Sequence, residues 1–477
     1  MRLALSLVVT ALVLGCATLP EIHPWSAAGD TGKTPTLVGT RGPLSNEQVA
    51  TVLARLKATS GESDLLARHI AIEEEAAGTP LTVGNQATLL RDGPATYQAM
   101  FDAIGSARDH VNLESYTVEQ DEVGRKFAEL LLRKAAEGVS VNLMYDSVGS
   151  NGTPPEFFES LRKGGVKVLE FNPVNPLKAR RGWRVNNRNH RKVLIVDGTV
   201  AFTGGINISD VYSSGSGGAG GGRSGFGYGS GAGSRPRVDA KDVPAGRKRG
   251  WRDTHVRILG PAVEQLQRIF LDTWGKQHGE ALPARNWYPQ TKREGGHPVR
   301  IVASGPGADV PAIYVTLLSA IAHAQKSVHI TVAYFVPDPQ AVAVLKAAAA
   351  RGVDVTLVLP SYTDFWGVFH AGRSHYSDLL EAGVKIYERQ QSLLHAKTVV
   401  IDGVWSTVGS SNLDWRSFLH NEELNAVILG WDFGREMEAM FQADLRDSVR
   451  IEREAWSRRP VDTRMKEWLG RAWGYWL

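Results

Sequence analysis

Two stretches of the chain carry the same polar residues at the same spacing. Residues 188–207 read RNHRKVLIVDGTVAFTGGIN, and residues 393–412 read LLHAKTVVIDGVWSTVGSSN. Each begins with H-x-K, continues with four mostly apolar residues and D-G, and ends in G-G-x-N or G-S-x-N. This repeat of histidine, lysine and asparagine indicates two copies of one chemical half-site.

Each motif is predicted to form a hairpin that gathers its polar groups. Residues two apart on a strand lie on one face, so His190 shares a face with Lys192, and His395 shares one with Lys397. Asp-Gly dipeptides then favour a tight turn. The returning strand is expected to bring an asparagine close to the histidine and lysine of its own half.

A cleft that combines both half-sites suits a phosphate group. Lysine and asparagine side chains bind its oxygens, one histidine attacks phosphorus, and the other protonates the leaving oxygen. The sequence contains no cluster of carboxylates or cysteines that points to a metal. We therefore expect neither a metal nor another cofactor.

The two motifs resemble the signature of the phospholipase D superfamily, H-x-K-x-x-x-x-D followed by G-[GS]-x-N, and the resemblance extends over residues 81–477. It implies candidate catalytic residues in both halves and one phosphate-binding asparagine in each. The catalytic candidates are His190, Lys192, Asp197, His395, Lys397 and Asp402, and the phosphate-binding candidates are Asn207 and Asn412. A D-G turn accounts for both aspartates by itself, and the family uses them mainly to support the structure.

Further stretches resemble bacterial cardiolipin synthases, among them RNHRK, FTGGINI, WRDTHVRILGPAV and GSSNLDWRSFLHNEELN. This resemblance implies that Asp253 and Glu423 are the carboxylates that orient the catalytic histidines. A carboxylate on one ring nitrogen fixes the tautomer of an imidazole and stabilises the imidazolium.

The same resemblance implies a phosphatidyltransferase that makes cardiolipin from phosphatidylglycerol through a covalent phosphatidyl-histidine. The family habit makes His190 the nucleophile, with His395 as the alternative. Phosphatidylethanolamine is an alternative donor, a monomer is expected, and no nucleic-acid partner is expected. Three other functions stay open: a phospholipase D that hydrolyses phospholipids, a phosphodiesterase acting on nucleic acid, and an inactive lipid-binding lipoprotein. The intact histidines and lysines argue against the last.

Strand and helix patterns alternate from residue 81 onwards, and the second half repeats the order of the first. A helix followed by Gly-Val-x-Val recurs at Gly138 and Gly352. We predict an α/β fold of two duplicated phospholipase D-type domains, 81–290 and 291–477, each a mixed sheet flanked by helices, with the active site at their interface. A helical stretch opened by a capping-box pattern at Ser45 and Gln48 is expected to brace them.

The N-terminus resembles a bacterial lipoprotein signal peptide over residues 1–15. A positive start and an apolar run too short to span a membrane lead into Val-Leu-Gly-Cys. Cys16, the one cysteine of the chain, is the expected lipidation site, and residues 16–80 form the tether and the helical extension. The resemblance implies a protein that is lipid-anchored in the cell envelope and faces the periplasm. By the sorting rule of that family, Ala17 after the cysteine implies the outer membrane over the inner one.

A Gly/Ser-rich insertion, residues 213–250, separates Asn207 from Asp253. Such sequence buries too little apolar surface to order itself, so we predict a flexible loop. Its basic residues, Arg247, Lys248 and Arg249, are interpreted either as a contact for anionic head groups or as part of a solvated linker.

Composition adds a weak preference for anionic partners. The chain has 477 residues, 43% of them hydrophobic, and a net charge of +4. Aromatic residues recur in a basic stretch at 177–184, in a loop at 364–369, and at the C-terminus, where Trp468, Ala472 and Trp476 are spaced by four. Together with a lipid anchor, these stretches predict binding to a membrane surface.

Overall fold

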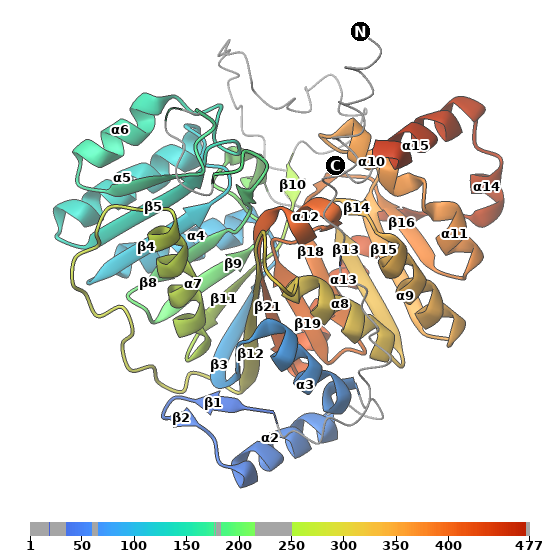
Figure 1. Cartoon of the computed structure of the whole chain (residues 1–477), viewed down its shortest axis with the longest axis horizontal. Coiled ribbons are helices and arrows are strands. Elements are labelled where there is room, and N and C mark those ends of the chain that lie inside the picture. The colour runs from blue at the N-terminus through green and yellow to red at the C-terminus, as the bar shows by residue number, and fades with distance from the viewer. Residues whose placement is uncertain are drawn as a thin grey trace, which may run out of the picture.

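The computed structural model describes residues 19, 35–59, 65–175, 177, 183–214 and 250–473. The predicted signal peptide, Cys16, residues 215–249 of the insertion (including its basic cluster) and Trp476 lie outside this range. The described chain forms two halves that lie side by side on one continuous sheet (Figure 1).

In the first half the strands lie in the order β6-β5-β4-β8-β9-β11-β3. β4, β5 and β6 are parallel to one another, and the other neighbours pair antiparallel. The strands are β3 (Leu81–Leu90), β4 (His110–Ser115), β5 (Ser140–Asp146), β6 (Lys167–Phe171), β8 (Val193–Val196), β9 (Val200–Gly204) and β11 (His255–Leu259). The helices are α4 (Gly93–Ser106), α5 (Glu122–Ala136), α6 (Pro155–Lys163) and α7 (Ala262–Lys276).

The second half repeats this arrangement in the order β12-β21-β19-β18-β13-β15-β16, with β22 at the edge. Its strands are β12 (His297–Ser304), β13 (Ser327–Val332), β15 (Asp354–Pro360), β16 (Lys385–Arg389), β18 (Lys397–Ile401), β19 (Trp405–Gly409), β21 (Asn421–Leu429) and β22 (Ser448–Arg450), and β14 (Phe335–Val336) pairs separately with β20 (Leu413–Asp414). Its helices are α8 (Ala312–His323), α9 (Pro339–Ala350), α10 (Trp366–Arg373), α11 (Tyr376–Glu381), α12 (Trp415–Leu419), α13 (Trp431–Arg446), α14 (Arg453–Ser457) and α15 (Val461–Trp473). Among the helices that the structure describes, none is long and apolar enough to cross a bilayer.

The two halves join where β3 pairs antiparallel with β12, the strand that holds the same position in the second half. One apolar cluster that crosses this junction joins strands and helices of both halves. It includes Ile258 of β11 and Phe270 of α7 together with Ile428 of β21 and Met437 of α13, all buried. The predicted duplication of an α/β domain with a mixed sheet is therefore confirmed, and the halves share one core.

Equivalent helices begin and end at equivalent signals. The carboxylate of Asp121 caps the N-terminus of α5, and that of Asp338 caps α9. After each helix the chain turns through a glycine with positive φ, 87° at Gly138 and 88° at Gly352, a conformation that costs glycine little. The next strand then enters the sheet beside its parallel neighbour.

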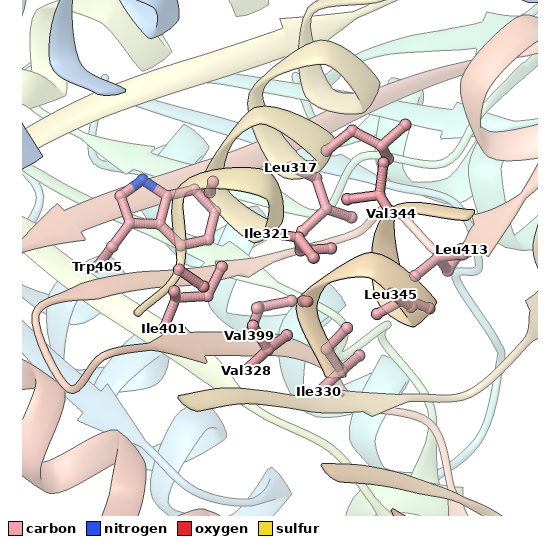
Figure 2. Packing of buried hydrophobic residues seen from close by; sticks show 14 of the residues in the cluster. Leu317, Ile321, Val328, Ile330, Val344, Leu345, Val399, Ile401, Trp405 and Leu413 are labelled. Atoms are coloured by element: carbon pink, nitrogen blue, oxygen red, sulfur yellow. The ribbon is translucent and has the colours of Figure 1, made fainter. Parts of the chain in front are cut away.

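The core of the second half lies between its sheet and two helices (Figure 2). Side chains of α8 and α9 pack against those of β13, β18 and β19. The labelled members are Leu317, Ile321, Val328, Ile330, Val344, Leu345, Val399, Ile401, Trp405 and Leu413. Burying each such side chain contributes about 1.5–3 kcal/mol, so this core fixes the hairpin that carries the second motif.

The N-terminal extension contacts both halves. It comprises β1 (Leu37–Gly39), β2 (Gly42–Pro43), α2 (Asn46–Thr59) and α3 (Leu65–Ala77). β1 pairs with β3 of the first half, and α3 binds residues of the second. The predicted capping box is present: Ser45 N donates to Gln48 Oε1 (3.0 Å), and Gln48 N donates to Ser45 Oγ (3.3 Å). Glu73 of α3 accepts from Trp405 Nε1 at 3.3 Å and from Arg300 Nη1 at 3.0 Å.

The Asp-Gly turns tie each hairpin to the neighbouring strand. Asp197 and Asp402 have positive φ, 51° and 52°. The carboxylate of Asp402 accepts hydrogen bonds from the backbone N–H groups of Gln325, Lys326 and Ser327 at 2.8–3.2 Å. The carboxylate of Asp197 makes the equivalent bonds with three consecutive N–H groups at the start of β4.

Replacing Asp402 with alanine should lower the free energy of unfolding by about 3 kcal/mol, because it removes charge-assisted bonds to three N–H groups and leaves alanine at positive φ. Urea unfolding followed by fluorescence measures this loss. Asp402→Asn is the matched control: it keeps one acceptor oxygen and tolerates positive φ, so its loss should be smaller. An Asp402→Ala protein with the wild-type unfolding midpoint would contradict this role.

Candidate active site

Short strands from one half bring the first motif to the other half. β7 (Arg188–Asn189) pairs parallel with the start of β21, Arg188 opposite Asn421 and Asn189 opposite Glu422. The backbone N–H of His190 then donates to the carbonyl of Glu422 at 2.9 Å. This register places the next residue of β21 beside the His190 side chain.

The second motif is held in the same way by the first half. β10 (Trp251–Arg252) pairs parallel with β17 (Leu393–Leu394), and the N–H of His395 donates to the carbonyl of Arg252 at 2.8 Å. Asp253 follows directly. Each histidine is therefore positioned by a strand end that belongs to the opposite half.

The side chains complete this exchange. His190 Nδ1 lies 3.0 and 3.1 Å from the two carboxylate oxygens of Glu423, and His395 Nδ1 lies 2.6 Å from Asp253 Oδ2. Both imidazoles are nearly buried, with 9% and 6% of their surface exposed. The structure thus brings together the histidines and carboxylates that the sequence singled out. Because a carboxylate contacts Nδ1 of each ring, Nε2 is the ring nitrogen that lies away from the carboxylate.

The two imidazole–carboxylate pairs differ electrostatically. Burial raises the pKa of Glu423 to about 7, against the opposing charge of Lys192. Burial would also raise the pKa of Asp253, but the contact with His395, the charge of Lys397 and the Thr254 N–H together outweigh it, and the pKa is lowered. Burial and the nearby charges of Lys397 and Lys192 lower the pKa of His395 to about 4. At neutral pH His395 is therefore a neutral base beside an ionised carboxylate.

Both motif lysines are buried beside their histidines. Lys192 Nζ donates to the carbonyl of His190 at 2.5 Å and lies 5.2 Å from the ring centre of Tyr116. Lys397 donates to the carbonyl of His395. Burial lowers the pKa of Lys397 to about 8. Since the charge of Lys192 acts on His395, the two motifs share one electrostatic environment.

The motif asparagines lie in different surroundings. Asn207 Oδ1 accepts from Thr117 N at 3.0 Å, and its amide donates to the Tyr212 hydroxyl at 3.1 Å. That hydroxyl lies 3.3 Å from Nδ1 of His395, the histidine of the other half. The backbone N–H of Asn412 donates to a serine hydroxyl, and its side chain lines a small cavity beside Lys397. Asn207 thus joins the two half-sites through one tyrosine.

Asp197 and Asp402 do not belong with these groups. They follow the last residues of β8 and β18, at the opposite end of each hairpin from the histidine, and their carboxylates bind backbone N–H groups. The structure therefore does not bring these two candidates together with the histidines and lysines of the motifs. They hold the hairpins that carry the histidines and do not reach the reacting atoms.

The sequence did not single out the aromatic walls of the site. Tyr116 packs edge-on against His190, with ring centres 5.1 Å apart. Trp251 and Tyr212 pack against His395 at 5.1 and 5.9 Å. One signal was available: Tyr212 follows Asn207 by five residues, the spacing at which a serine follows the second asparagine.

Arg191, the middle residue of the first motif, was also overlooked. Its guanidinium donates to Thr273 Oγ1 of α7 (2.9 Å), to Glu422 Oε2 (2.5 Å) and to the carbonyl of Glu423 (3.2 Å). This buried cation ties the two halves together around the strand end that carries Glu423. The second motif has alanine at the equivalent position.

Within the part of the chain that the structure describes, one group of three carboxylates lies close enough together to hold a cation: Glu119, Asp121 and Asp210. Asp121 accepts from two backbone N–H groups, and Glu119 accepts from a serine hydroxyl. These bonds explain the group as a helix cap and loop anchor.

Comparison with known proteins gives a consistent result. A family model described as "Cardiolipin synthase, PLD-like domain" matches residues 100–214 and 317–445. The cardiolipin synthase of Geobacillus thermodenitrificans (strain NG80-2) is 36% identical over 395 residues, which cover 82% of this chain and 72% of that protein. Cardiolipin synthase 2 of Bacillus anthracis is 36% identical over 381 residues, covering 79% and 68%.

Among solved structures, the phosphatidylserine synthase of Haemophilus influenzae Rd KW20 superposes with a TM-score of 0.58 over 85% of this chain and 99% of that one. At 12% identity this likeness supports the fold alone. The fold and the paired histidines together define a phospholipase D-type enzyme. Within that superfamily, the chain belongs to the cardiolipin synthase family. Its class of activity is therefore phosphatidyl transfer in phospholipid synthesis.

The lowered pKa of Lys397 predicts an alkaline limit to activity. The ammonium group is present below about pH 8 and is lost above it, so kcat/KM on detergent-dispersed phospholipid should fall as the pH rises through about 8. Lys397→Arg keeps its charge at this pH, so this variant should not show the alkaline fall in kcat/KM. If that variant does not turn over, the pH dependence of inorganic phosphate binding, measured by calorimetry, provides the same comparison. A fall at the same pH in both proteins would contradict the assignment of this pH dependence to Lys397.

Proposed function

We propose that the protein makes cardiolipin by transferring a phosphatidyl group from one phosphatidylglycerol to the hydroxyl of another. The observation that carries this proposal is the pair of imidazoles, each bound to a carboxylate of the opposite half, in a chain of the cardiolipin synthase family. Two such groups supply the nucleophile and the proton that a phosphodiester exchange needs.

In the first step, Nε2 of His190 attacks phosphorus and the bond from phosphorus to the glycerol oxygen breaks. His395 gives its proton to that oxygen, and glycerol leaves. In the second step the now neutral His395 takes the proton from the hydroxyl of the second phosphatidylglycerol. The hydroxyl oxygen attacks phosphorus, and the phosphorus–nitrogen bond to His190 breaks. The lysines and asparagines of both motifs bind the phosphate oxygens.

In this mechanism His395 must carry a proton in the first step, and substrate binding explains how it gains one. His395 is neutral in the free protein, because burial and two lysines lower its pKa. A bound phosphodiester brings a negative charge that offsets the lysines, so the pKa of His395 rises. Asp253, which is ionised, stabilises the resulting imidazolium. The acid therefore forms when the substrate arrives.

Lipid substrates agree with the predicted anchor. We propose that Cys16 carries the acyl groups and that the globular part lies on the periplasmic side of a bacterial membrane, with the outer membrane favoured. The enzyme acts as a monomer, because both half-sites come from one chain. Phosphatidylglycerol is the first donor to test, and phosphatidylethanolamine is the alternative.

The products of labelled phosphatidylglycerol distinguish the candidate activities. The purified protein should convert phosphatidylglycerol to cardiolipin and glycerol, measured by thin-layer chromatography and mass spectrometry. A second reaction with added phosphatidylethanolamine identifies the donor. Phosphatidic acid as the main product would replace the synthase by a hydrolase, because water would then be the acceptor. No product with either lipid would overturn the proposal.

Trapping the covalent intermediate assigns the two histidines. His190→Asn and His395→Asn should each lower turnover at least about a thousandfold, as expected where two groups act together. After acid-free quenching with labelled substrate, the His395→Asn protein should retain phosphatidyl label and the His190→Asn protein none. The reverse pattern makes His395 the nucleophile. His323→Asn, which alters a histidine on α8, is the matched control and should keep wild-type turnover.

A further inference from the structure

Helix α15 presents an apolar stripe to solvent. Four large apolar residues recur at helical spacing, and their surfaces are 78%, 60%, 68% and 42% exposed. They are Val461, Met465, Trp468 and Leu469, called here the α15 stripe. Helices of a globular protein bury such a stripe as a rule. The large exposed apolar surface therefore indicates a partner that is itself apolar.

The opposite face of α15 is fixed against the protein. Glu467 is 2% exposed and binds Arg459, with 2.8 Å between Nη2 and Oε2. Gly470 lies so close to α10 that a Cβ there would come within 2.6 Å of Ala371 N. This polar and small-residue packing sets the rotation of the helix, so the α15 stripe cannot turn inward without breaking it.

Two arginines border one edge of the stripe, and an acid–base pair borders the other. At 100° per residue, Arg464 and Arg471 lie along the first edge, whereas Asp462 lies on the second edge and Lys466 lies just beyond it. The three basic residues are exposed, and Lys466 pairs with Asp462 at 3.1 Å at the surface. An apolar face with cationic borders is the pattern of helices that lie in the interface of an anionic bilayer.

The stripe lies at the end of the molecule that holds the active site. Figure 1 shows α15 against α10, at the same end of the view as β10 and α12, whereas α2 lies at the other end. Phe365 and Trp366, at the start of α10, are 46% and 57% exposed. The residue before them, Asp364, binds the Tyr334 hydroxyl, and its charge acts on Lys397. Exposed apolar side chains therefore lie both on α15 and beside the loop residue whose charge acts on the catalytic lysine.

We infer that the α15 stripe, together with Phe365 and Trp366, is the surface by which the protein lies on an anionic phospholipid bilayer. Docked in this way, the end of the sheet that carries the catalytic histidines faces the lipid. The inference rests on the proposed function in taking lipid as the substrate, but the binding itself requires no turnover.

Charge favours a bilayer over a second copy of the chain. A twofold dimer through the α15 stripes would bring the arginines and lysines that border one stripe close to those of the other. Like charges at such an interface oppose association, whereas phosphate head groups of either leaflet neutralise them. The structure therefore assigns the stripe to lipid.

Vesicle binding of the full chain tests this assignment. Every variant carries Cys16→Ser so that no acyl anchor contributes. Trp468→Ser/Leu469→Ser should weaken co-sedimentation with vesicles of phosphatidylglycerol and phosphatidylcholine at least about tenfold, or 1.4 kcal/mol. Turnover on vesicle substrate should fall in parallel. Turnover on detergent-dispersed substrate should stay unchanged, because neither residue touches the catalytic groups.

Trp431→Ser is the matched control. Trp431 is 48% exposed and lies beside Gly403, in the hairpin turn at the opposite end of β18 from His395. The Trp431→Ser protein should bind vesicles as the parent protein does. Arg464→Gln should weaken binding to anionic vesicles and leave the weaker binding to pure phosphatidylcholine unchanged.

Three outcomes would overturn the inference. The first is wild-type vesicle binding by the Trp468→Ser/Leu469→Ser protein. The second is an equal loss in the Trp431→Ser control. The third is a parent protein that is dimeric by light scattering and becomes monomeric in the stripe variant. If vesicles bind as expected but no lipid product forms, the proposed function fails and the docking surface stands.

Discussion

The structure depends on one arrangement: each half supplies the carboxylate that binds the catalytic histidine of the other half. Glu423 of the second half holds His190, and Asp253 of the first half holds His395. This exchange requires that two short parallel pairings, β7 with β21 and β10 with β17, keep register across the junction. A slip of one residue would turn each carboxylate to the other face. The shared core around β3 and β12 is therefore part of the catalytic apparatus, because it holds that register.

Burying so many ionisable groups in one place is costly unless each is paired. The structure meets this requirement with further charges around the histidines. Asp444 of α13 binds Arg252 through both carboxylate oxygens (3.0 and 2.8 Å) and also contacts Arg389 at 3.3 Å. Arg252 precedes Asp253 directly, so this cluster fixes the carboxylate that orients His395. Removing one member would leave a buried charge without compensation, which links the stability of α13 to the geometry of the site.

Most of the fold followed from the sequence because its signals are local. The H-x-K hairpins, the Asp-Gly turns, the capping box at Ser45 and the repeated helix-to-strand turns each depend on a few neighbouring residues. The resemblance to a family also singled out Asp253 and Glu423. The exchange between halves was not predicted, since spacing along the chain does not say which half a strand end joins. Arg191 was missed for the same reason: strand alternation gives the side on which it points and not the helix that it reaches. The different proton affinities of Asp253 and Glu423 arise from burial and from neighbours distant in sequence.

Both copies of the duplicated unit belong to one polypeptide, and they join where β3 pairs with β12. Two identical copies meeting about a twofold axis would have to present the same residue at every equivalent position, because one gene would specify both. Fusion of the two copies into one chain removes this restriction, and equivalent positions of the two halves now carry different residues. The position after β4 is Tyr116 and the position after β13 is Ala333, while Trp251 stands opposite β17 where Asn421 stands opposite β7. An ancestral symmetry that gave two equal half-sites has thus been relaxed into a site with two distinct sides. Selection can then shape the side that receives the donor independently of the side that receives the acceptor.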